Sequence, residues 1–235
     1  MKLLAIDSSG LVATVALLND DTIMGEYTIH NKKTHSQTLL PMIRDLLEMA
    51  EVRTDELDAL AVAAGPGSFT GLRIGAATAK GLAQALDLPL VAIPTLEGLA
   101  YNVVGTDSLV CPLMDARRNQ AYYGIYEVAE NGVTTVVEQA AGPLEDVIRH
   151  INHLGSPVVF LGDGVPVFEE QLRREIQVPY QFAPAHVRYQ RASSVAVLGK
   201  FAMERHETLS AGEFSPFYLR VSQAERERLE REKNS

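Results

Sequence analysis

The segment with the clearest potential for chemistry is the glycine-rich loop AAGPGSFTGLRIG, residues 63–75. Loops of this kind often cradle phosphate groups, because the peptide N–H groups at a helix start can hold an anion. A nucleotide-hydrolysing phosphate loop ends in Gly-Lys-Ser/Thr. Here Gly67 and Ser68 are followed by Phe-Thr, and the nearest lysine is Lys80. The residue types therefore favour a tight strand-to-helix turn, with an anion site at Gly67 and Ser68 as the second interpretation.

Metal and nucleophile chemistry has little support in the sequence. His30 and His35 are five residues apart, but they straddle a loop that holds two lysines and no carboxylate. Neither a His-Glu-x-x-His helix nor a Gly-x-Ser-x-Gly elbow occurs. Cys111, the only cysteine, lies within an apolar strand, where a thiol is inert. We therefore predict no catalytic residue and no metal site.

Composition narrows the class of protein further. A net charge of −9 over 235 residues argues against binding of RNA or an anionic membrane by the chain alone. A single cysteine fits a reducing compartment. The apolar part of the start, MKLLAIDSSG, is too short for a signal peptide, and no run approaches a membrane span. We predict a cytoplasmic protein.

Hydrophobic periodicity gives the elements that must position these residues. Three strands come first, followed by helix, strand, helix, strand and helix, at residues 3–6, 12–17, 23–29, 35–50, 57–64, 69–86, 88–93 and from 95. Residues 109–206 partly repeat this order. The pattern predicts two α/β lobes, each a mixed sheet with helices packed on it. We assign 1–105 to the N-terminal lobe, 106–220 to the C-terminal lobe and 221–235 to a polar tail, either an exposed helix or disordered.

Two helix starts carry capping signals. Thr34 and Gln37 have the spacing of a capping box, and Thr95 has the residue type of an N-cap.

The helix after the glycine-rich loop is unusually smooth on one face. Glycine inside a helix costs about 0.5–1 kcal/mol relative to alanine, which the close approach of another backbone would offset. Small residues recur there at every fourth position, at Gly71, Gly75, Ala79 and Ala83. Two interpretations stand: the ridge faces the protein's own sheet, or part of it faces a partner.

The apolar stripe of the preceding helix is also wide. It is wider than the stripe of a helix that faces a core on one side and water on the other. One stripe holds Leu39, Ile43, Leu46 and Ala50, and Met42 and Met49 lie on a face beside it. The two helices either bury each other or share a surface for another protein.

Four segments of the chain resemble one family closely: LLAIDSSGLVATVAL, AVAAGPGSFTGLRIGAATAKGLA, MDARRNQAYYGIY and SPFYLR. They resemble the bacterial TsaB (YeaZ) proteins over essentially the whole chain. TsaB itself looks like an inactive paralogue of TsaD. TsaD is the enzyme that transfers a threonylcarbamoyl group to an adenosine beside the tRNA anticodon. The two-lobed outline also resembles actin, the sugar kinases and the large heat-shock chaperones, which implies actin-like (ribonuclease-H-like) lobes.

The resemblance implies a non-catalytic subunit that binds and activates a TsaD-like transferase as a heterodimer. It places the docking face on the two apolar helices, at Leu39, Met42, Ile43, Leu46, Met49, Gly71, Arg73, Gly75, Ala79, Leu82 and Ala83. A TsaE-like ATPase would join the complex, tRNA would bind only through the complex, and ATP or ADP would bind at the shared interface. The isolated protein would need no cofactor, and its docking face could form a homodimer.

Active members of this superfamily hold metal and phosphate at the two hairpin turns, which here carry Asp7 and Asp115. Asp7, Ser8 and Ser9, together with Gly67 and Ser68, are accordingly the candidate nucleotide-binding residues. Aspartates that bond their own turn are common, however. The alternative function is an actin-like ATPase or a small-molecule phosphotransferase.

Overall fold

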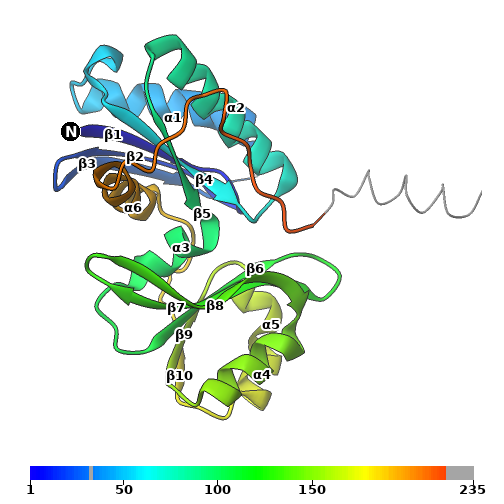
Figure 1. Cartoon of the computed structure of the whole chain (residues 1–235). Coiled ribbons are helices and arrows are strands. Elements are labelled where there is room, and N and C mark those ends of the chain that lie inside the picture. Colours follow the sequence, from blue (N-terminus) through cyan, green and yellow to red (C-terminus); the bar gives the residue numbers. More distant parts are fainter. Residues whose placement is uncertain (32–33, 221–235) are drawn as a thin grey trace, which may run out of the picture.

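The computed structural model describes residues 1–31 and 34–220, so the predicted tail at 221–235 lies outside the described residues. The chain forms two five-stranded mixed sheets (Figure 1). The first has the order β3 (Thr22–Ile29), β2 (Ala13–Asn19), β1 (Lys2–Asp7), β4 (Ala59–Gly65) and β5 (Leu90–Pro94). The second has the order β10 (Tyr180–Phe182), β9 (Val158–Leu161), β6 (Leu109–Asp115), β7 (Gln120–Ala129) and β8 (Gly132–Pro143). The predicted pair of α/β units is confirmed.

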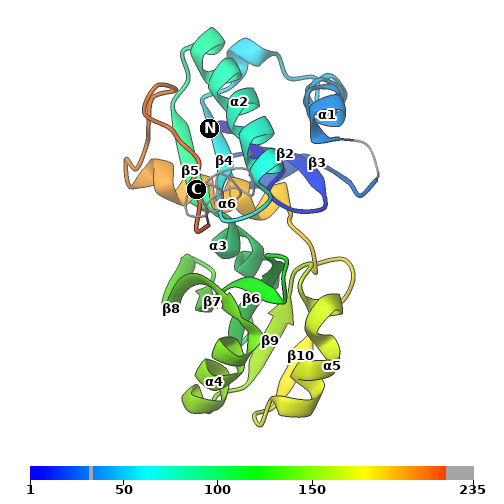
Figure 2. The ribbon, with the colours of Figure 1, turned by 90° about the vertical axis from the view of Figure 1, so that its right-hand side faces the viewer.

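Helices cover both faces of each sheet (Figures 1 and 2). The helices are α1 (His35–Met49), α2 (Phe69–Leu86), α3 (Thr95–Ala100), α4 (Leu144–Leu154), α5 (Val165–Glu175) and α6 (Ala192–Glu204), with short 3-10 turns at Thr54–Glu56 and Tyr101–Val103. Strand alternation directs Leu4 and Ile6 of β1 toward α1 and α2, while Leu3 and Ala5 face α6. In the second lobe α4 and α5 share a core with Phe160.

The last helix of each half packs on the other half's sheet. Helix α3 follows the first-lobe strands in the chain and contacts β6, β7 and β8 of the second sheet as well as β4 and β5 of the first, and α6 contacts β1, β2, β4 and β5. The two helices form a middle layer with one continuous core that includes Leu3, Leu96, Tyr126 and Val195 (Figure 2). The structure therefore corrects the assignment of all of 106–220 to the second lobe, because α6 completes the first.

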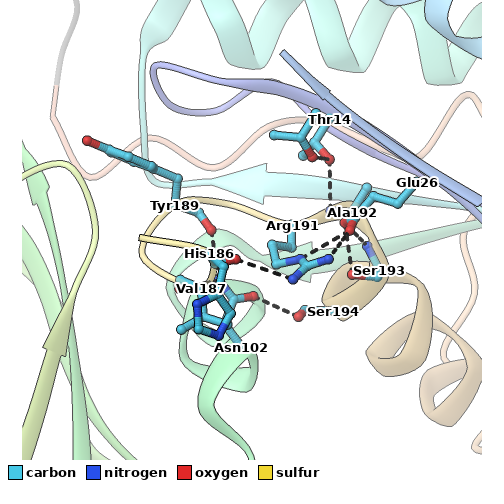
Figure 3. A network of polar contacts seen from close by, with 11 residues as sticks. Thr14, Glu26, Asn102, His186, Val187, Tyr189, Arg191, Ala192, Ser193 and Ser194 are labelled. Carbon is cyan, nitrogen blue, oxygen red and sulfur yellow. Dashed lines mark hydrogen bonds and ion pairs between the residues drawn. The ribbon is translucent and has the colours of Figure 1, made fainter. Parts of the chain in front are cut away.

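The chain crosses from the second lobe to α6 through a half-buried polar network (Figure 3). Asn102 Nδ2 donates to the carbonyls of Val187 and Tyr189 at 3.0 and 2.8 Å, and its Oδ1 accepts from Ser194 Oγ at 2.7 Å. One side chain thus ties both crossing segments to α6. We call this network the hinge.

The N-cap residue of α6, Arg191, makes no side-chain hydrogen bond to the first amides of the helix. Side chains from β2 and β3 accept from these amides instead. The Glu26 carboxylate accepts from Ser193 N at 2.9 Å and from the Arg191 guanidinium, and Thr14 Oγ1 accepts from Ala192 N at 3.2 Å (Figure 3). A carboxylate at a helix N-terminus is stabilised by the free N–H groups and the helix dipole. These contacts fix the start of α6 to β2 and β3.

Two predicted caps are wrong. Thr34 is at the N-cap position of α1, but its hydroxyl bonds none of the free backbone N–H groups of the helix; it pairs with Ser36 Oγ at 3.0 Å. Thr95 lies inside α3, and its Oγ1 accepts from Gly65 N at 3.1 Å, so it anchors the glycine-rich loop.

Candidate docking face and cleft

The glycine-rich loop lies directly on the turn between β1 and β2. Ser68 N donates to the carbonyl of Ser9 at 2.7 Å, and Ser8 Oγ donates to the carbonyl of Gly71 at 2.9 Å. A Cβ at Gly67 would lie 2.4 Å from the Ser9 carbonyl oxygen, and one at Gly71 would lie 2.1 Å from that of Ser8. These glycines are required by the close approach of two backbones, which supports the interpretation as a tight seat for α2.

Asp7 is buried within the same turn. Its Oδ1 accepts from Ser9 N at 2.8 Å and from Ser9 Oγ at 2.6 Å. Burial raises the pKa of the Asp7 carboxyl from 3.8 to about 6, although the two Ser9 bonds and the His35 charge act in the opposite direction. The structure thus brings together the five candidate nucleotide-binding residues, but their polar groups bond one another.

The second lobe repeats this arrangement with different chemistry. The loop after β9 packs on the end of β6, where Gly164 N donates to the Leu113 carbonyl at 2.9 Å. Asp163 Oδ1 accepts from Asp115 N at 3.1 Å, and Asp115 in turn accepts from Arg117 N at 2.8 Å and pairs with its guanidinium at 3.1 Å. Burial raises the pKa of Asp163 to about 6.

A cleft of about 330 Å³ separates the two turns. Its walls include Ser9 and Ser68 from the first lobe and Asp115 and Asp163 from the second. Tyr218, Leu219 and Arg220, which follow α6 by more than a dozen residues, line its mouth. None of these last three residues was in the predicted set, since nothing in their spacing indicates where an irregular segment runs.

The predicted docking ridge on α2 faces inward. Gly71, Gly75, Ala79 and Ala83 are buried, and a Cβ at Gly75 would lie 2.5 Å from Ser8 Oγ. Leu39, Met42, Ile43 and Leu46 of α1 are likewise buried in the first-lobe core. The prediction that these eight residues contact a partner is therefore corrected: they pack against the protein's own turn and sheet.

The remaining predicted docking residues reach the surface. Met49 is 76% exposed, Arg73 is exposed and Leu82 is half-buried. Arg73 lies over the Phe69 ring, with its guanidinium carbon 4.1 Å from the ring centroid.

The residues that α1 and α2 turn away from the sheet define a different surface. We call Leu40, Met49, Arg73, Ala77, Gly81 and Ala85 the outward face. Ala77, Gly81 and Ala85 are exposed at every fourth position, and a Cβ at Gly81 would meet no atom within 4 Å. The sequence also contains this second stripe of small residues. The docking face was predicted on the neighbouring ridge because that ridge holds more glycine.

The histidines and the cysteine occupy structural positions. His35 Nε2 lies 3.0 Å from the Gly10 carbonyl, and His30 packs edge-on against the Tyr189 ring. Cys111 is buried, which raises the pKa of its thiol. Over residues 1–31 and 34–220, no three His, Cys, Asp or Glu side chains come close enough to share a metal ion. A search of that same part of the chain finds no helix that could span a membrane.

The two mixed sheets, with α3 and α6 between them and a cleft, form the fold of the actin-like ATPases. The activator of the 2-hydroxyisocaproyl-CoA dehydratase from Clostridium difficile, solved with bound ADPNP, matches with a TM-score of 0.52 over 89% of this chain and 99% of that chain. The identity is 12%, so this likeness shows the fold alone.

Closer relatives show the family. YeaZ from Pseudomonas aeruginosa matches with a TM-score of 0.79 and 32% identity over 93% of this chain and 99% of that chain. The Bacillus subtilis tRNA threonylcarbamoyladenosine biosynthesis protein TsaB is 35% identical over 233 residues, 99% of this chain and 100% of its own length. The Escherichia coli TsaB is 36% identical over 167 residues, 70% and 72% of the two chains. The family model for the tRNA N6-adenosine threonylcarbamoyltransferase TsaD matches residues 22–228. The chain belongs to the TsaB (YeaZ) family of tRNA threonylcarbamoyladenosine biosynthesis proteins, and the predicted family is confirmed.

Proposed function

We propose that this chain is a non-catalytic subunit that binds a TsaD-like transferase through the outward face of α1 and α2. The complex then transfers the threonylcarbamoyl group to the adenosine beside the tRNA anticodon. The observation that carries the proposal is the exposure of the small residues Ala77, Gly81 and Ala85 at every fourth position of α2, together with the exposed apolar side chain of Met49 on α1. Exposed residues without bulk allow the close approach of another helix, and exposed apolar side chains are typical of interaction surfaces.

The non-catalytic role is supported by the turns that flank the cleft. The carboxylates of Asp7 and Asp163 bond neighbouring backbone and hydroxyl groups, and their raised pKa values reflect burial. A carboxylate already committed to its own turn offers little to a metal or phosphate. We therefore favour the subunit over the actin-like ATPase, and we assign ATP or ADP to the interface of the complex.

The remaining partners follow from the same surface. The net charge of −9 leaves tRNA to be held through the complex. A TsaE-like ATPase would join the assembled pair. Without the transferase, the outward face is the surface through which we expect two copies of the chain to associate.

The test introduces a charge at the outward face and at a matched control position. Met49→Glu and Ala77→Glu are expected to weaken binding of the TsaD from the same organism at least about tenfold, or about 1.4 kcal/mol, because the new carboxylate is desolvated. The control is Val167→Glu on α5 of the second lobe, where the wild-type side chain is 56% exposed. Titration calorimetry measures the affinities, and thermal melting checks that all three variants stay folded.

Equal affinities for the Met49 variant, the Ala77 variant and the control would exclude the outward face. Loss of binding in the Val167 variant alone would move the interface to the second lobe.

A further inference from the structure

A segment of irregular chain connects the end of α6 to the mouth of the cleft. We call residues 207–220 the strap; in Figure 1 it runs in orange and red along the side of the first lobe. Leu209 forms an isolated antiparallel bridge with Leu90 of β5, with N–O distances of 2.8 Å in both directions. Lys80 Nζ of α2 donates to the Phe214 carbonyl at 2.9 Å. Phe214 itself is 1% exposed within the first-lobe core, so this half of the strap is firmly anchored.

The second half of the strap crosses the glycine-rich loop. Phe217 N donates to the Ala64 carbonyl at 2.7 Å. Gly65 has a φ of +117°, and a Cβ there would lie 2.1 Å from the Phe217 carbonyl oxygen. Only glycine permits both this backbone conformation and this approach. The loop is therefore shaped to receive the strap as well as the β1–β2 turn.

The end of the strap reaches the other lobe. The Tyr218 ring packs on Phe69 with centroids 4.7 Å apart, and the Arg220 guanidinium donates to the carbonyl of Ala116, which follows β6. Tyr218 and Arg220 also line the cleft. The strap thus lines the cleft and joins the lobes at a place remote in sequence from the hinge.

The two halves of the strap differ in how strongly they are held. Phe214 is buried, whereas Phe217 is 48% and Tyr218 is 36% exposed. Within the described residues the outer half is held by one backbone bond, one ring contact and one arginine–carbonyl bond, and in each of them the strap residue is at least partly exposed. The hinge, by contrast, has three side-chain hydrogen bonds of Asn102 at half-buried positions, and the start of α6 next to it is held by the Glu26–Arg191 ion pair and by the amides of Ala192 and Ser193. Contacts at exposed groups are the first to open in a native protein.

We propose that residues 215–220 are a releasable closure of the cleft: when they detach, the lobes open about the hinge and uncover the turns of Asp7 and Asp163. The proposal is independent of the docking role, because it concerns the relation of the two lobes within one chain.

The test measures the separation of the lobes in the full-length chain. Spin labels are attached at Gln84→Cys on α2 and Glu170→Cys on α5, both exposed positions; the native Cys111 is buried and stays unlabelled. The variant Tyr218→Ala/Arg220→Ala is expected to shift the distance distribution to longer values and to broaden it. Hydrogen exchange of the Phe217 amide is expected to accelerate by about tenfold or more, since its protecting bond opens with the strap.

The control is Arg173→Ala, which removes an arginine that pairs with Glu169 and packs on Phe182 within the second lobe. It is expected to leave the distance distribution unchanged. Arg220→Ala alone removes a surface contact without touching the core, and an intermediate shift is expected. An unchanged distance distribution in both the double and the single strap variants, with Phe217 exchange as slow as in the wild type, would overturn the proposal.

Discussion

The two lobes seat their glycine-rich loops on equivalent turns but hold them by different means. In the first lobe the loop and α2 contact Ser8 and Ser9 backbone to backbone, and the carboxylate of Asp7 is buried beneath them. In the second lobe the loop contacts Leu113 closely, but its Asp163 carboxylate reaches across to the amide of Asp115, and Arg117 covers the outside. Both loops therefore need glycine at the close approach, and the second lobe adds a charged cover through Asp163, Asp115 and Arg117.

The same loop-on-turn contact lies in a covered environment in the first lobe and in an exposed environment in the second. The first-lobe loop is covered by the strap and by α2, so bulk is excluded and glycine is required. The exposed turn around Arg117 is free to use polar side chains, because water can solvate what the protein leaves unpaired. In both seats the aspartate bonds its own turn: Asp7 accepts from Ser9, and Asp163 accepts from the amide of Asp115.

The largest effect is expected where the glycine-rich loop of the second lobe contacts the end of β6. Gly162 has a φ of +102°, and a Cβ there would lie 2.1 Å from the Leu113 carbonyl oxygen. Gly162→Ala is expected to lower the free energy of unfolding by about 2–6 kcal/mol, because overpacking and backbone strain add. Gly71→Ala in the first lobe meets the Ser8 carbonyl at the same distance without an unfavourable φ. Its expected loss is about 1–3 kcal/mol. Urea unfolding measures both, and an equal loss at the two glycines would remove the strain contribution.

The second prediction compares the buried aspartates. The pKa of Asp7 is raised in the folded state from 3.8 to about 6, so folding favours its protonated form. Its contribution to stability is therefore complete below pH 3.8, is lost as the pH rises through 6, and is constant above that. The change amounts to about 3 kcal/mol at most, at 1.36 kcal/mol per pKa unit. The difference in unfolding free energy between Asp7→Asn and the wild type should change between pH 4 and pH 7, in favour of the variant at pH 7. Asp163→Asn should behave alike, and a difference that is independent of pH for either variant would contradict the assigned burial effect.

The smallest effect is expected from a comparison of the two stripes of small residues on α2, one buried and one on the outward face. Gly81 is exposed with open space around it, whereas Gly75 packs on Ser8. Gly81→Ala is expected to raise the free energy of unfolding by about 0.5–1 kcal/mol, because it adds helix propensity without a clash. Gly75→Ala should lower it. Thermal melting measures both, and destabilisation by Gly81→Ala would show that the outward face is covered in the isolated protein.

The elements of the fold were predictable because their periodicities are local. Strands such as β4 and β9 are continuous apolar runs, and α4 shows its apolar stripe over three turns. Periodicity states that a helix face is covered but not by what. For this reason Gly75 was assigned to a partner although it contacts Ser8, and α6 was assigned to the lobe that precedes it in the chain.

The cleft was predictable only in part. The turns at Asp7 and Asp115 follow apolar strands, which marks them as hairpin turns in the sequence. The capping predictions for Thr34 and Thr95 were wrong, because a hydroxyl near a helix start can also bond a neighbouring hydroxyl or an amide outside the helix. The course of the strap depends on tertiary contacts of Phe217 and Arg220 that no local pattern encodes.

The exchange of α3 and α6 between the lobes has a consequence for the growing chain on the ribosome. The face of β1 that carries Leu3 and Ala5 is covered by residues of α6 nearly two hundred positions later. Until translation passes residue 204, β1 and β2 lack the helix that covers this face, since α3 packs only on the β4 and β5 side of the same sheet. Contacts of such long sequence separation form late and slowly, and a chain that waits for them exposes apolar strands. The two lobes are therefore expected to fold as one cooperative unit once α6 has been synthesised, rather than one after the other.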